Sequence, residues 1–353
     1  MNSAIVLLIC VPLFTEPAAP QRAQHRNALV PHAVRASRRP ASLSNSDSGS
    51  HEVRLGGREY IYLSAWARAK GLELRWAKRD ETLLLSNRST RLLFNIDSRE
   101  AEINGIQVWL SFGPVLHGGA VCLAKLDLET TVQPILIPPR NQAREKIKTI
   151  CLDPGHGGKD PGYCVGPNQE KKYALLLANE VRQQLGQSGL KVVLTRTQDN
   201  FIELPVRPDI ANRQKADLFV SLHFNASETE RNSVQGAQVF CLTPAGAAST
   251  NSQGEGGGAG WCAGNRCNEK NFLLAFQLQK ALTGELSVQD RGVRRARFAV
   301  LRDAQMPAVL IEAGFMSHPV EGKKIFSSAY RKQMARAIVD GLLAYKRTVE
   351  QAG

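Results

Sequence analysis

Four side chains in the C-terminal part of this chain have the types that hydrolysis of an amide or ester requires. His156 follows the sequence Asp-Pro-Gly, and Glu170 lies just before an apolar segment with helical spacing. His223 and Glu312 each end an apolar run. Two imidazoles and one carboxylate are a common ligand set for catalytic zinc, with water in the fourth position. A second carboxylate that does not bind the metal can transfer protons, so these residue types predict a metal-dependent hydrolase.

Three of the four residues stand where a strand-like apolar run gives way to a loop. His156, His223 and Glu312 follow such runs, at 147–152, 218–222 and 308–311. In a parallel sheet these ends lie on one edge, where ligands bind in open α/β folds. We therefore expect residues far apart in the sequence to meet there.

Each residue also has a purely structural interpretation. His223, between Leu222 and Phe224, has the setting of a satisfied core histidine, and Glu170 that of an exposed carboxylate favoured by the helix dipole. Glu312 is harder to explain in this way, because an unpaired buried carboxylate is costly. On spacing alone, both the metal site and these structural interpretations stay open.

The pattern from residue 147 to 348 predicts a layered α/β domain with a mostly parallel sheet flanked by helices. The predicted strands are 147–152, 191–195, 218–222, 237–242, 299–301 and 308–311. The predicted helices are 173–187, 209–215, 272–286 and 330–346.

Residues 52–137 have a different texture, with short alternating runs separated by turn sequences, typical of a small β-rich domain. One short helix is expected from Ala65 to Lys70. Residues 138–146, which begin with Pro138 and Pro139 and follow Pro134, are expected to form a linker.

The first residues and the overall charge bear on location and partners. Residues 1–19 contain a short apolar run and form a candidate signal peptide, although no Lys or Arg precedes the run. Residues 20–51 are rich in Arg, Ala, Pro and Ser and are expected to be a disordered basic linker. The net charge of +13 favours an anionic partner, but aromatic residues do not alternate with the basic ones. We therefore expect no nucleic-acid binding.

A Gly-rich segment and the cysteines complete the unusual features. Residues 243–271 form a long insertion, which we expect near the cleft. Cys262 and Cys267 flank a short loop and could pair in an oxidising compartment. Cys122, Cys151 and Cys241 are interpreted as small buried residues.

Several motifs, in order, resemble the zinc-dependent N-acetylmuramoyl-L-alanine amidases of the Amidase_3 family. The resemblance covers about residues 147–346 and rests on Leu-Asp-Pro-Gly-His156-Gly-Gly, Glu170-Lys-Lys, Val-Leu-Thr-Arg-Thr (193–197), Ser-Leu-His223-Phe-Asn-Ala, Arg291-Gly-Val and Val-Leu-Ile-Glu312-Ala-Gly-Phe. It implies a zinc exopeptidase-like fold, with Zn²⁺ held by His156, Glu170 and His223 and with Glu312 as the catalytic carboxylate.

The implied reaction cleaves the amide between N-acetylmuramic acid and L-alanine in peptidoglycan, during wall remodelling or daughter-cell separation. The resemblance also implies a periplasmic or extracellular enzyme, here expected to be a monomer, with any activator protein unknown. Residues 52–137 resemble, less specifically, the copper amine oxidase-like N-terminal domain, which implies a stalk or wall contact without copper chemistry. His318 and Gln169 depart from the family pattern, in which Asn and Lys are common. The alternatives are a zinc peptidase acting on wall peptides and a non-catalytic peptidoglycan-binding protein.

Overall fold

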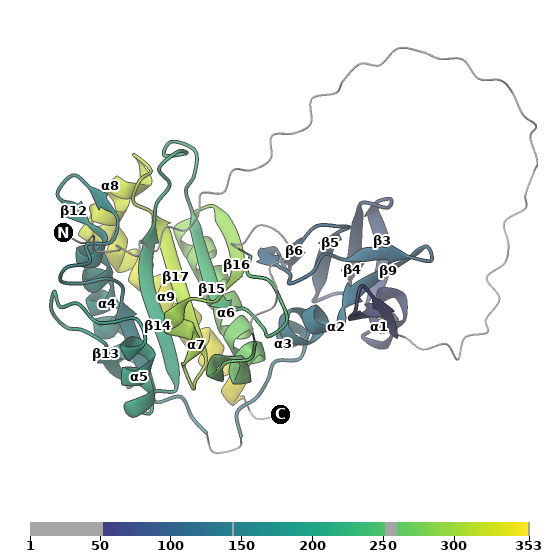
Figure 1. Ribbon diagram of the computed structural model, residues 1–353, viewed down its shortest axis with the longest axis horizontal. Coiled ribbons are helices and arrows are strands. Elements are labelled where there is room, and N and C mark those ends of the chain that lie inside the picture. Colours follow the sequence, from purple (N-terminus) through teal and green to yellow (C-terminus); the bar gives the residue numbers. More distant parts are fainter. Residues whose placement is uncertain (1–51, 143–144, 251–259, 352–353) are drawn as a thin grey trace, which may run out of the picture.

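A single sheet joins the N-terminal and C-terminal parts of the protein (Figure 1). The computed structural model describes residues 52–142, 145–250 and 260–351. Within these residues, the sheet has eleven strands in the order β13-β10-β14-β17-β15-β16-β7-β6-β5-β4-β3. A four-stranded sheet, β1-β2-β9-β8, lies beside its N-terminal half.

The elements of the N-terminal part are mostly short strands. They are β1 Glu52–Leu55, β2 Arg58–Tyr62, α1 Leu63–Ala69, β3 Glu73–Lys78, β4 Thr82–Ser86, β5 Arg91–Asn95, β6 Glu100–Ile103, β7 Ile106–Trp109, β8 Val115–His117, β9 Ala120–Ala124, α2 Lys125–Asp127, the π-helical turn Leu128–Val132 and α3 Gln133–Leu136.

The C-terminal part alternates strands and helices. Its elements are β10 Thr149–Pro154, β11 Cys164–Val165, β12 Asn168–Gln169, α4 Glu170–Gly186, β13 Lys191–Leu194, α5 Val206–Arg213, β14 Leu218–Asn225, β15 Ala237–Leu242, the 3-10 turn Ala263–Cys267, α6 Asn268–Leu286, β16 Asp290–Ala296, α7 Ala299–Arg302, β17 Ala308–Phe315, α8 Glu321–Phe326 and α9 Ser328–Glu350.

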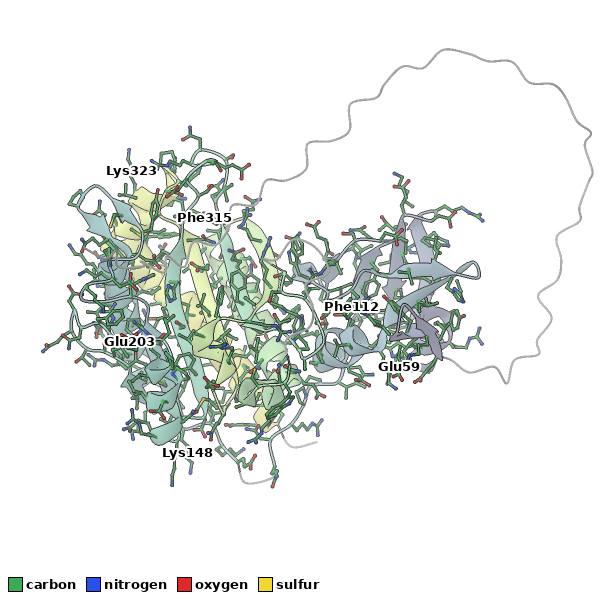
Figure 2. All side chains as sticks on the ribbon, viewed as in Figure 1. Glu59, Phe112, Lys148, Glu203, Phe315 and Lys323 are labelled. Atoms are coloured by element: carbon green, nitrogen blue, oxygen red, sulfur yellow. The ribbon has the colours of Figure 1, made fainter. Side chains whose placement is uncertain are left out.

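The central strands run parallel, which places their carboxyl ends together. β13, β10, β14 and β17 are parallel neighbours, whereas β15 is antiparallel to β17. Every residue of β17 is buried, as expected for a strand covered on both faces. Figure 2 shows the two edges, with Phe315 at the carboxyl end of β17 and Lys148, just before β10, at the opposite edge.

Helices cover the two faces of this sheet unequally. On one face, α4, α6 and α9 pack together over side chains such as Val220 and Ile311. The other face carries the shorter α5 and α7 over a smaller cluster that includes Phe219 and Leu310 (Figure 1). Leu310 precedes Glu312 by two residues on β17, so this smaller cluster lies under the half of the strand that leads to the predicted site.

The two parts of the chain meet at a seam between β16 and β7. Val293 pairs in parallel with Val108, and the Gln107 amide donates to Asp290 Oδ2 at 2.8 Å. The Arg294 guanidinium lies 4.3 Å from the centroid of the Trp109 ring. Backbone pairing, a charged acceptor and a cation–π contact thus cross the same boundary.

A buried arginine strengthens the seam. Arg295 is fully buried and donates to Thr130 O at 2.9 Å and to Thr131 Oγ1 at 2.7 Å. Its guanidinium carbon lies 4.9 Å from the centroid of the Phe272 ring. Arg295 therefore ties β16 to the turn at Leu128–Val132 and to α6.

The structure confirms the predicted fold class, an α/β region with a β-rich N-terminal part, and corrects several predicted elements. Residues 299–301 belong to helix α7, Ala299–Arg302, and do not form a strand. This single helical turn buries the neighbouring side chains of Val300 and Leu301 together. The sequence prediction missed strand β16, where Asp, Arg and Gly hide the apolar signal, and the helical turns of residues 125–136.

Further predictions concern the ends of the chain and the cysteines. Cys122, Cys151 and Cys241 are buried, as predicted, whereas Cys262 and Cys267 are free thiols. Residues 1–51, with the candidate signal peptide and the basic linker, lie outside the described residues. Among the helices that the structure describes, none combines the length and apolar character needed to cross a membrane.

Replacing Arg295 with Met should lower the urea midpoint of unfolding, because Thr130 O and Thr131 Oγ1 lose a charged donor in a buried place. A loss of about 2–4 kcal/mol is expected from broken buried charge-assisted hydrogen bonds. Arg302→Met, at an exposed position in α7, is the matched control and should change the midpoint little. Equal midpoints for both variants would contradict the role given to Arg295.

Candidate metal centre and catalytic carboxylate

Three predicted ligands meet at the carboxyl edge of the sheet. Ligand atoms of His156, Glu170 and His223 lie within 4.8 Å of one another. Glu170 Oε1 is 3.0 Å from His156 Nε2 and 3.0 Å from His223 Nδ1. The two imidazole rings are edge to face, with centroids 4.8 Å apart. The fold therefore brings two nitrogen donors and one carboxylate into a single site.

Glycine and a left-handed backbone place His156 at the end of β10. His156 has φ of +59°, a conformation that costs energy for a residue with a Cβ. A Cβ on Gly155 would lie 2.2 Å from Cε1 of His223, so only glycine allows the two strand ends to approach this closely.

Two buried arginines hold the carbonyl groups of the same loop. Arg196 donates to Pro154 O at 3.0 Å and to Gly155 O at 2.7 Å. Arg207 donates to Pro154 O at 3.0 Å and to His156 O at 2.9 Å. These bonds satisfy carbonyl groups that an irregular buried loop would otherwise leave unpaired.

Asp153, which is fully buried in β10, belongs to the same hydrogen-bond network. Its carboxylate accepts from Thr195 Oγ1 at 2.6 Å, Arg207 Nη1 at 2.9 Å and Ser221 Oγ at 2.7 Å. Burial by itself raises the pKa of Asp153, but Arg207 and the two hydroxyl groups outweigh burial and lower it. The ionised carboxylate thereby ties β10 to β14 and to the residue that follows β13.

Glu170 is the first residue of α4 and is 5 % exposed, so the interpretation as a solvated carboxylate at a helix start is wrong. Its Oε2 accepts from the Tyr163 amide at 3.0 Å, and its Oε1 from the Phe224 amide at 3.1 Å. Burial raises the pKa of Glu170, but His156 and His223 outweigh it and hold the pKa well below its usual range. The side chain is therefore an anion fixed by backbone donors.

Asp160 orients the ring of His156. Asp160 Oδ2 lies 2.8 Å from His156 Nδ1, which leaves Nε2 facing Glu170. Burial lowers the pKa of His156, but the charge of Glu170 and the contact with Asp160 outweigh burial and raise it to about 10. A carboxylate on the far nitrogen is typical of metal-binding histidines, because it sets the tautomer and the ring direction.

Glu312 lies beside the cluster and outside it. On β17 it is in register with His223 of β14, and it is 8 % exposed. Its Oε2 is buried and makes no hydrogen bond with the described residues. Burial, and then the charge of Glu170, raise the pKa of Glu312 well above its ordinary value. A carboxyl group with a raised pKa next to a ligand cluster suits proton transfer.

Comparison with known proteins identifies the family. Residues 150–344 match the model of the N-acetylmuramoyl-L-alanine amidase family, Amidase_3. The chain belongs to this family. It is 36 % identical over 223 residues to the N-acetylmuramoyl-L-alanine amidase AmiC of Neisseria meningitidis serogroup B. This match covers 56 % of this chain and 53 % of the Neisseria protein. It is 32 % identical to AmiA of Salmonella typhimurium, over 59 % of this chain and 79 % of that protein.

A solved structure, the N-acetylmuramoyl-L-alanine amidase of Clostridium difficile 630, matches with 33 % identity and a TM-score of 0.47. The match covers 57 % of this chain and 97 % of that one. The chain spans about half the length of some curated relatives, including the Neisseria protein.

The two positions that were expected to depart from the family pattern are His318 and Gln169. His318 Nδ1 accepts from the amides of Val320 and Glu321, at 3.3 and 3.2 Å. These two bonds hold the backbone where α8 begins. Gln169, the other departure, lies in β12 immediately before Glu170 and has extended backbone geometry.

The Gly-rich insertion of this Amidase_3 domain starts and ends far from the cluster. β15 leads into it, and Cys241 near the end of β15 pairs with Val309 near the start of β17. The Thr250 amide donates to Arg295 O, and Asn265 Nδ2 donates to Thr243 O. Both acceptors lie at the edge where β17 starts. The described residues of the insertion, 243–250 and 260–271, thus lie at the edge opposite the site, and the expectation that they border the cleft is wrong.

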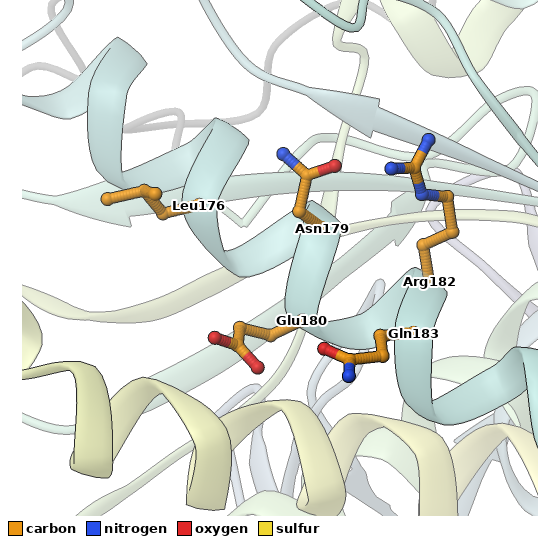
Figure 3. A pocket seen from close by; sticks show the side chains of 5 residues that line it. All are labelled: Leu176, Asn179, Glu180, Arg182 and Gln183. Atoms are coloured by element: carbon orange, nitrogen blue, oxygen red, sulfur yellow. The ribbon is translucent and has the colours of Figure 1, made fainter.

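A surface hollow on α4 does not compete with this site. It is lined by Leu176, Asn179, Glu180, Arg182 and Gln183, all from one helix (Figure 3). These side chains include one carboxylate and no imidazole or thiol, so they lack the donors of a metal centre.

Sequence reasoning named the four central residues but not those that support them. It did not assign roles to Asp153, Asp160, Arg196 or Arg207. Asp153 and Arg196 stand inside the quoted motifs, and a charged residue directly after a buried strand was an available signal. Arg207 sits in α5 and had no such signal.

Replacing Asp160 with Asn should weaken metal binding about 10- to 100-fold, because His156 Nδ1 loses its charged partner. Titration with zinc in competition with a chelator measures this change. Asp209→Asn, at an exposed position in α5, is the matched control and should bind like the parent protein. Unchanged affinity in Asp160→Asn would refute the orienting role.

Proposed function

We propose that this protein is a zinc-dependent hydrolase that cleaves the amide between N-acetylmuramic acid and L-alanine in peptidoglycan. In this proposal His156, Glu170 and His223 bind zinc, and Glu312 is the catalytic carboxylate. The observation that carries it is the position of Glu312, in register with His223 and beside a cluster of three ligands. The names of its relatives as N-acetylmuramoyl-L-alanine amidases support the same assignment.

The donor set favours zinc over harder ions. Two imidazoles and one carboxylate suit zinc, whereas Mg²⁺ and Ca²⁺ prefer oxygen ligands. Glu170 Oε1 lies 3.0 Å from a nitrogen of each histidine. That spacing is close to the ~3.3 Å that separates neighbouring ligands of a tetrahedral ion with ligand distances of ~2.0 Å. When bound, zinc polarises a carbonyl oxygen and lowers the pKa of water.

In the proposed reaction, Glu312 transfers the protons. Glu312 accepts the proton of the attacking water and transfers it to the nitrogen of L-alanine as the C–N bond breaks. The water oxygen remains on the lactyl group as a carboxylate, and the stem peptide leaves with a free amino group. Burial and the charge of Glu170 raise the pKa of Glu312, which favours the step in which the protonated group gives its proton to the leaving nitrogen.

The other parts of the chain fit an envelope enzyme. We propose that residues 147–348 are the catalytic domain and residues 52–137 a spacer or wall-contact domain of the copper amine oxidase-like type, without copper chemistry. The net charge of +13 would favour contact with an anionic wall polymer. We propose a monomer in the periplasm or outside the cell.

Digestion of purified peptidoglycan tests the reaction. The protein should release stem peptides with a free L-alanine amino group together with peptide-free glycan, which mass spectrometry detects. A chelator should abolish the release, and added zinc should restore it. Release of amino acids or shorter peptides would instead identify a peptidase, and binding without cleavage would identify a wall-binding protein.

Variants of the four residues should separate metal binding from proton transfer. Glu312→Gln should keep the zinc content of the parent and lose about 10²- to 10⁴-fold in kcat, the usual contribution of general acid–base catalysis. His156→Ala and His223→Ala should lose bound zinc. Metal analysis and the amidase assay on the same samples measure both effects. Full zinc in either histidine variant, or near-normal kcat in Glu312→Gln, would overturn the assignment.

A further inference from the structure

Gln238 extends the row of polar residues formed by His223 and Glu312. On β15, Gln238 is in register with Glu312, and Glu312 is in register with His223 on β14. Residues opposite one another on neighbouring strands point to the same face of a sheet. His223, Glu312 and Gln238 therefore lie side by side on one face, about 4.8 Å from strand to strand.

This row lies beyond the part of the face that α7 covers. α7 contacts β15 and β17, and Phe240 and Leu310 belong to the buried cluster beneath it. Gln238 and Glu312 are each two residues further toward the carboxyl edge of β17. Gln238 is nevertheless 5 % exposed, which is unusual for a carboxamide without a structural task.

The backbone around Gln238 is held from several sides. The Gly236 amide donates to Glu321 Oε2 at 3.1 Å, and the same oxygen accepts from the Phe315 amide at 2.7 Å. Glu321 thus fastens the start of β15 to the end of β17. Gln279 Nε2 donates to Ala237 O at 2.8 Å. The position of Gln238 relative to Glu312 is therefore fixed.

Its side chain, in contrast, has no structural partner. Within the part of the chain that the structure describes, the carboxamide of Gln238 makes no hydrogen bond, and its oxygen and nitrogen are not among the buried polar atoms that lack a partner, so they reach the surface at this edge. A carboxamide that has a fixed backbone, no protein partner and polar atoms open at the edge beside Glu312 is available to a ligand.

We propose that Gln238 binds the first peptide unit that follows the scissile amide, on the leaving side of the substrate. The proposal rests on the proposed amidase function and adds a specificity residue to it. A carboxamide has one acceptor oxygen and two donor hydrogens, so it can pair with both the N–H and the C=O of a peptide unit.

The order of residues in the row matches the order of groups in the substrate. The carbonyl of the scissile amide belongs at the cluster of His156, Glu170 and His223, and the nitrogen that receives a proton belongs beside Glu312. The next peptide unit then lies one strand further along the row, at Gln238. Its distance from the scissile nitrogen is set by one residue of extended chain, about 3.3–3.8 Å.

The test compares two substrates and two proteins. The first substrate is N-acetylmuramoyl-L-alanyl-D-isoglutamine, and the second has an ester oxygen in place of the N–H that follows L-alanine, with the scissile amide intact. Wild-type protein should lose about tenfold in kcat/KM on the ester analogue, because a hydrogen bond to Gln238 is lost. Gln238→Leu should lose about tenfold on the peptide and lose nothing further on the analogue, since the two changes remove the same contact.

Controls separate this contact from other effects. Gln198→Leu, at an exposed position in the loop after β13, should behave like wild type on both substrates. Zinc content and melting temperature of Gln238→Leu should match the parent. Equal wild-type rates on the two substrates, or losses that add in the variant, would overturn the role of Gln238. Failure of the wild-type protein to cleave either substrate would instead overturn the amidase function.

Discussion

The parallel register of β10, β14 and β17 is the constraint on which the site depends. It brings His156, which follows β10, and His223 and Glu312, which lie near the carboxyl ends of β14 and β17, to one edge. The register is held near that edge by the Asp153 carboxylate, which bonds to Thr195, Arg207 and Ser221. Because these partners come from separate elements, a shift of one strand would break several charge-assisted bonds together.

The same edge holds two carboxylates in opposite states. Glu170 is surrounded by two imidazoles and two backbone amides, and its pKa is low. Glu312 has an unpaired buried oxygen and the charge of Glu170 nearby, and its pKa is raised. In the proposed mechanism, this difference in pKa separates the carboxylate that binds the metal from the carboxyl group that carries the proton.

The sequence predicted the parts of this site that depend on local pattern. Apolar runs ending in a polar residue indicated the strand ends, and chemistry-bearing residue types indicated the cluster. It could not predict partners that meet only after folding, such as Arg207 with His156 O or Arg295 with Thr131. Strand β16 was missed for the same reason, since its arginines are buried through contacts that come from distant segments.

The seam between β16 and β7 and the edge that holds Glu312 belong to one continuous sheet. β15, which carries Gln238, lies between β17 and β16, and β16 pairs with β7 of the N-terminal part. Asp290 links the seam to β15. Its carboxylate accepts from the Gln107 amide across the seam and from Gln279 Nε2, and Gln279 Nε2 also donates to Ala237 O at the start of β15. A spacer joined only by a flexible linker would have no such chain of contacts to His223, Glu312 and Gln238. The N-terminal part is thus built into the sheet that positions Glu312 and Gln238.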